Sequence, residues 1–132
     1  ITPKLQRSWT MTNINLTPCV IDAETRRNGE AAIARLIATE AVSGRPDNRA
    51  VALSLGMVST LKELSGEDVP YGSYACIAAG IGETLRVIAR QTEHPTPDLE
   101  AIAGASLLCA DLADLIDAEL ERLSDELFHA RR

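Results

Sequence analysis

Carboxylates are the most numerous side chains in this sequence that could do chemistry, and many of them lie in its last third. On a helical wheel, six fall on one face of a predicted helix: Glu100, Asp111, Asp114, Asp117, Glu121 and Asp125. Paired carboxylates that face the core of a helical bundle can hold magnesium. This face lies opposite the apolar side of the helix, so two interpretations remain: a solvated surface, or an acidic docking stripe for a basic protein partner.

Histidine and cysteine chemistry has little support. Glu126 and His129 form one ExxH pair, which is half of the di-iron motif of ferritin-like bundles, and a second ExxH is absent. Cys19, Cys76 and Cys109 are widely spaced without a CxxC pair, and we expect Cys76 and Cys109 to be small core residues and Cys19 to be the most exposed thiol. We therefore predict no catalytic residue, no cofactor and no metal site.

Glu40 is the one carboxylate that the pattern directs toward a core, because it shares a wheel angle with Ile33 and Leu36. A buried carboxylate needs a partner, and Arg26 on the same helix is too distant. Either a cation from another helix reaches Glu40, or the end of the helix is exposed and Glu40 is hydrated. An inward Glu40 would favour an enzyme with carboxylates in its core.

Composition restricts the function classes further. The 132 residues, enough for one domain, carry 13 Lys and Arg against 19 Asp and Glu, a formal net charge of -6. Without a basic run, direct nucleic-acid binding is not expected. The longest uncharged run is shorter than the roughly 20 apolar residues of a membrane crossing, so no membrane association is expected. The lack of a signal-peptide pattern and the cysteine usage favour a cytoplasmic location.

The elements that must position these residues are predicted to be helices, since strand-like alternation is missing and aromatic residues make up only 3% of the chain. We expect an all-α four-helix bundle with helices at about 22–43, 47–64, 73–91 and 98–129, where Asp22 and Ser73 act as N-caps. The bundle domain spans 19–132. Residues 1–18 form an extended arm, and because this arm contains Met11, residues 1–10 are either native or an added extension.

Two apolar surfaces exceed what one small bundle can bury. The segment Tyr74 to Gly82 contains no charge, so we expect it to be buried nearly all round, with Ala75, Ala79 and Gly82 as a smooth stripe for a close helix crossing. The fourth helix has a heptad seam and is about 15 Å longer than its neighbours, so its last apolar residues extend past the bundle: Leu120, Leu123, Leu127 and Phe128.

These surfaces predict a non-enzymatic protein-binding or regulatory protein that acts as a homodimer through the third helix, the end of the fourth, or both. The arm, with Trp9, Ile14 and Leu16, could instead cover the fourth helix within one chain. Two alternative functions remain: a small-molecule or metal-dependent enzyme with carboxylates in the bundle core, and an acidic inhibitor that imitates nucleic acid.

Overall fold

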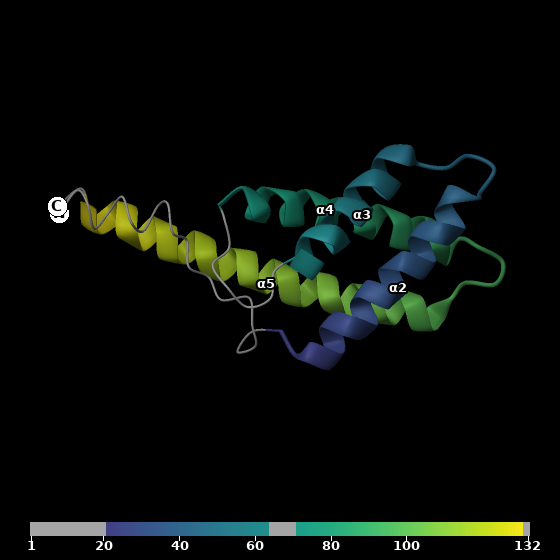
Figure 1. Ribbon diagram of the computed structural model, residues 1–132, viewed down its shortest axis with the longest axis horizontal. Coiled ribbons are helices and arrows are strands. Elements are labelled where there is room, and N and C mark those ends of the chain that lie inside the picture. Colours follow the sequence, from purple (N-terminus) through teal and green to yellow (C-terminus); the bar gives the residue numbers. More distant parts are fainter. Residues whose placement is uncertain (1–20, 64–70, 131–132) are drawn as a thin grey trace.

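The protein folds into a bundle of four helices (Figure 1), as the sequence predicts. The computed structural model describes residues 21–63 and 71–130, and the helices are α2 (Ala23–Ala41), α3 (Asn48–Glu63), α4 (Tyr71–Thr92) and α5 (Leu99–Ala130). No strand occurs in these two ranges. The predicted arm and the predicted stop of the second helix at Ser65 and Gly66 lie outside them.

Helix boundaries follow the local sequence signals at the starts of α2 and α5. The Asp22 carboxylate accepts a hydrogen bond from the Thr25 N–H, and Asp98 accepts one from the Ala101 N–H at 3.1 Å. That backbone hydrogen bond holds the pKa of Asp98 below its ordinary value. The prediction of Ser73 as an N-cap is wrong, because α4 already has helical backbone from Tyr71 onward.

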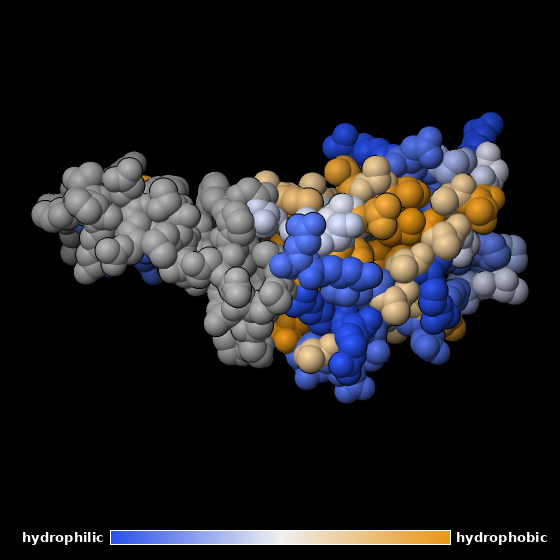
Figure 2. Space-filling view, in the orientation of Figure 1, coloured by the Kyte–Doolittle hydropathy of each residue, from blue (hydrophilic) through white to orange (hydrophobic). Residues whose placement is uncertain are grey.

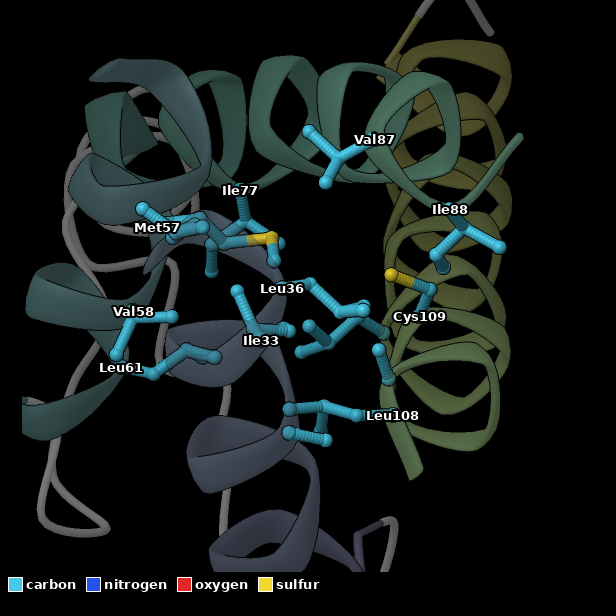
Figure 3. Close-up of a cluster of buried hydrophobic side chains, with 14 of the residues drawn as sticks. Ile33, Leu36, Met57, Val58, Leu61, Ile77, Val87, Ile88, Leu108 and Cys109 are labelled. Atoms are coloured by element: carbon cyan, nitrogen blue, oxygen red, sulfur yellow. The ribbon is translucent and has the colours of Figure 1, made fainter. Parts of the chain in front are cut away.

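The core forms where apolar side chains from all four helices meet (Figure 3). Ile33 and Leu36 of α2 point toward Met57 of α3 and Ile77 of α4, and each is fully or almost fully buried. On the other side of this cluster, α5 contributes Leu108 and Cys109. The helices pack most extensively as two pairs, α2 with α5 and α3 with α4.

One glycine in each of these helix pairs permits the two helices to approach closely. A Cβ atom at Gly29 of α2 would lie 2.4 Å from the Leu108 Cβ, and one at Gly80 of α4 would lie 2.3 Å from the Met57 Cβ. A Cβ at Gly82 would have no heavy atom of another element within 4 Å. The close crossing within this chain therefore uses Gly80, on the opposite side of α4 from the predicted stripe.

The long α5 projects from the bundle. Figure 1 shows its C-terminal end continuing past the other three helices. It has 32 residues, whereas α4 has 22, and this difference of ten residues corresponds to about 15 Å. None of the described helices combines the length and the hydropathy needed to cross a membrane.

Candidate interaction surfaces

The uncharged segment of α4 is exposed along one side. Its inward face buries Ile77 and Gly80, whereas Ala75, Ala79 and Gly82 are exposed to solvent. The prediction that this segment is buried nearly all round is therefore wrong for a single chain. The reason is geometric, because α3 and the α2–α5 pair cover only the opposite face of α4.

The margin of this α4 face carries one carboxylate and two arginines. Glu83 is near two cations, with Arg86 Nε at 3.5 Å and Arg49 Nε at 3.7 Å from its Oε2 atom. Leu85 adds a half-exposed leucine to the outer side of the same helix. The α4 face, defined by Ala75, Ala79 and Gly82, is thus small, smooth and uncharged, with one more cation than anion at its margin.

The C-terminal part of α5 exposes three of the four apolar side chains that the sequence singles out. The exposed fractions are 58% for Leu120, 43% for Leu127 and 55% for Phe128. Leu123 differs, because only 6% of it is exposed, so it belongs to the buried side of the helix and the prediction of an exposed Leu123 is wrong. Leu120 and Leu127 continue the heptad seam that Ile116 begins.

The acidic stripe of α5 faces solvent, as its wheel position predicts. Asp111 is half-buried, and the other five carboxylates are exposed: Glu100, Asp114, Asp117, Glu121 and Asp125. Arg35 of α2 contacts Glu100 at 3.6 Å. No Lys or Arg within residues 21–63 and 71–130 forms an ion pair with the other members of the stripe. Most of its negative charge is therefore available to an outside partner.

Glu40 is buried and has a partner from another helix. Only 5% of it is exposed, and its Oε1 accepts a hydrogen bond from Arg90 Nε of α4 at 2.9 Å. Its Oε2 accepts a second from the Asp47 N–H at 2.8 Å, and Arg90 also donates to the Arg45 carbonyl. The hydrogen bond with Glu40 raises the pKa of Arg90. Of the two alternatives that the sequence leaves open for Glu40, the structure shows the inward carboxylate with a cation from another helix, and not the hydrated one.

These contacts give the Glu40 carboxylate a structural role. Both oxygens accept hydrogen bonds, and the cluster ties the α2–α3 loop to the end of α4. The second inward carboxylate, Glu119 of α5, receives hydrogen bonds on both oxygens from Arg122, at 2.7 and 2.8 Å. Each inward carboxylate is thus neutralised by an arginine. General acid–base catalysis instead needs a carboxylate that can exchange a proton with a substrate.

Arg122 also engages the glutamate of the ExxH pair formed by Glu126 and His129. It donates from Nη1 to Glu126 Oε1 at 2.6 Å, so the predicted half-motif pairs its glutamate with an arginine rather than with a metal. Sequence reasoning missed this cluster, although the i, i+3 and i, i+4 spacing of Glu119, Arg122 and Glu126 is a known signal for helix ion pairs. Among the residues that the structure describes, no three His, Cys, Asp or Glu side chains could hold a metal ion.

Tyr74 lies close to this cluster, and its buried hydroxyl has no hydrogen-bond partner among the residues that the structure describes. Desolvation, with a smaller contribution from Glu119, raises the pKa of Tyr74 well above its ordinary value. We expect Tyr74→Phe to leave the free energy of unfolding unchanged or to raise it by up to about 1 kcal/mol, since an unsatisfied polar group is removed. Urea unfolding followed by circular dichroism measures this change.

Thr84→Val is the matched control for Tyr74→Phe, because it also removes one buried hydroxyl with little change in volume. The Thr84 hydroxyl donates to Ser54 Oγ at 2.9 Å, and both side chains are fully or almost fully buried. We expect a loss of about 1 to 2 kcal/mol here. Equal losses in the two variants would contradict the assignment of Tyr74 as unsatisfied.

The two described cysteines show no sign of activation. Cys109 is buried, and desolvation raises the pKa of its thiol to about 11, so at neutral pH it stays protonated. Cys76 is half-buried, with its Sγ 3.3 Å from the Thr60 hydroxyl. Cys19 lies outside the described residues. A buried, neutral thiol at Cys109 matches its predicted role as a small core residue.

A groove of about 450 Å³ runs between α2 and α5 and was not predicted. Small residues contribute to its lining, among them Ala31, Ala32 and Gly104. Arg35, at its edge, is engaged by Asp98 and Glu100. Figure 2 shows further apolar surface where α3 passes α2, and the half-exposed Leu55 belongs to α3. Polar and charged side chains form most of the rest of the groove lining: Asp22, Glu24, Thr25, Asn28, Arg35 and Glu100. The groove is therefore a mostly polar surface, whereas Leu55 adds apolar surface on α3.

Comparison with known proteins adds no assignment. The chain matches no protein-family model, no curated protein and no solved structure.

Proposed function

We propose that this chain is a non-enzymatic protein-binding or regulatory protein that acts through its helix surfaces as a homodimer. The observation that carries the proposal is the exposed, uncharged α4 face, defined by Ala75, Ala79 and Gly82. Small side chains let two helices approach closely, and a two-fold axis would place this face against its own copy. At the margin of the face, Glu83 compensates part of the charge of Arg49 and Arg86.

The acidic stripe supports the second part of the proposal, which is binding of a basic protein partner. Apart from Glu100, the carboxylates of the stripe form no ion pair with the residues that the structure describes, so they create a local negative potential. Such a potential speeds encounter with a basic surface more than it strengthens the final complex. The predicted cytoplasmic location is part of the same proposal. Its support is the cysteine usage, with Cys109 buried as a free thiol.

Light scattering on the whole chain at micromolar concentration tests the dimer. We expect about twice the chain mass of 14.2 kDa, and about the chain mass for Ala79→Arg, because a charged side chain would be forced into the interface. Ala34→Arg is the control, since Ala34 is an exposed alanine of α2, outside this face. A mass near 14.2 kDa for the unaltered chain, or equal effects of the two arginines, would contradict the proposal.

The enzyme alternative predicts a different result. A carboxylate site that binds magnesium or zinc would raise the thermal midpoint when the ion is added, because a ligand of the folded state stabilises it. The observations at Glu40 and Glu119 favour structural ion pairs instead, since arginine engages both carboxylates. The acidic-inhibitor alternative shares the acidic stripe but would require that this chain compete with nucleic acid for binding to the partner.

A further inference from the structure

The C-terminal seam of α5 is an apolar surface with charged margins. It consists of Ile116, Leu120, Leu123 and Leu127, whose spacing of four, three and four residues is that of a coiled-coil seam. Leu120 and Leu127 are strongly exposed, although they continue the side of α5 that packs in the core at Cys109 and Leu112. Leu123, between them in the sequence, is buried, so the open part of the seam consists of Leu120 and Leu127.

Acidic side chains flank this seam on both sides. Asp117 is exposed directly beside the seam on one flank, and the exposed Glu121 lies further round the helix on the same side. On the other flank, Glu119 and Glu126 both contact Arg122, and Glu119 is buried. Across residues 116–130, five carboxylates stand against this one arginine. The charges at such flanking positions set which helix a seam accepts.

This charge pattern distinguishes between two candidate binding partners of the seam, a second copy of the chain and a basic helix. A second copy of the same seam, in parallel or antiparallel orientation, would bring acidic flanks against acidic flanks. The residues that define the α4 face carry no charge, so the proposed dimer is assigned to that face and not to the α5 seam. A helix with leucine-like residues on one face and lysine or arginine beside them would satisfy both the apolar seam and its acidic flanks.

We infer that the C-terminal seam of α5 binds an amphipathic helix with basic flanks from a partner protein. This inference rests on the proposed protein-binding function and specifies the chemistry of the partner. The docked helix covers Leu120 and Leu127 with its apolar face, and its cations lie against Asp117 and Glu121. Salt weakens the complex, because the flanking charges are exposed and are screened by ions.

A labelled synthetic helix of about three heptads tests the inference, with leucine at the seam positions and lysine at the flanks. Fluorescence anisotropy with the full chain should show binding, and a peptide with glutamate at the same flanks should not bind. Replacing Leu120 or Leu127 by serine should weaken binding about tenfold each, because a buried leucine contact is lost. Asp117→Asn with Glu121→Gln should weaken it several-fold and reduce its dependence on salt.

Leu107→Ser is the matched control, because Leu107 is also an exposed leucine of α5 but lies on the opposite side of the helix. It should leave the affinity unchanged. Equal binding of the two peptides, or equal loss with Leu107→Ser and Leu120→Ser, would overturn the inference. So would failure of the full chain to bind the lysine peptide, the result expected if residues 1–18 or a second copy already cover the seam.

The two proposals fail separately in these measurements. A chain that is dimeric by light scattering but does not bind the lysine peptide contradicts only the partner helix. A monomeric chain that binds the lysine peptide through Leu120 and Leu127 contradicts only the dimer. A Leu120→Ser change that halves the mass shows that a second copy occupies the seam, and it overturns the inference.

Discussion

Replacing Glu40 by alanine is expected to lower the free energy of unfolding by about 3 kcal/mol, because a buried and fully hydrogen-bonded carboxylate is lost. The variant leaves the Asp47 N–H without its acceptor and separates the end of α4 from the α2–α3 loop. Glu40→Gln should cost about half as much, since the amide oxygen still accepts one hydrogen bond while the charge is gone. Urea unfolding with circular dichroism detection measures both.

Two comparisons identify the cause of the Glu40 effect. Glu63→Ala removes an exposed carboxylate of α3 and should change the free energy of unfolding by less than about 0.5 kcal/mol. Arg90→Ala should also destabilise, and the double variant should lose less than the sum of the single losses, because the two groups interact. Strict additivity of Glu40→Ala and Arg90→Ala would show that the ion pair does not contribute.

The helices of this protein were predictable because their signals are local. Asp22 and Asp98 are N-cap residues that act within three residues of themselves, and both do so in the structure. The prolines around residue 96 separate α4 from α5 in the same local way. A periodic apolar pattern then requires each helix to bury one face, and a bundle is the simple result.

Contacts between helices were predictable only in part. The wheel placed Glu40 toward the core, but nothing in the sequence near it indicates that Arg90, fifty residues away, provides the counter-charge. The predictions about the α4 face have the same limitation, because they also depend on contacts between helices. An uncharged stretch of α4 can pack through either side, and the sequence does not say that Gly80 rather than Gly82 meets Met57. Whether the outer side is covered depends on partners outside a single chain.

Gly80→Ala is expected to lower the free energy of unfolding by about 2 to 3 kcal/mol through overpacking. The new Cβ would lie 2.3 Å from the Met57 Cβ and 2.8 Å from the next side-chain carbon of Met57. A Cβ position is fixed by the backbone, so relief requires α3 and α4 to move apart. That movement would also strain the buried hydrogen bond between Thr84 and Ser54. Gly29→Ala should lower the free energy of unfolding in the same way, because its Cβ would overlap the Leu108 side chain.

Gly82→Ala provides the matched control on the same helix, and it should change stability in the opposite direction. A Cβ there has no neighbour from another element within 4 Å, so alanine should raise the free energy of unfolding by up to about 1 kcal/mol through its better helix propensity. This gain holds for the monomer, measured at low concentration. If two α4 faces cross at Gly82 in the proposed dimer, the added methyl group should weaken association as the concentration rises. Destabilisation by Gly82→Ala at every concentration would contradict the assignment of Gly80 as the packed side of α4.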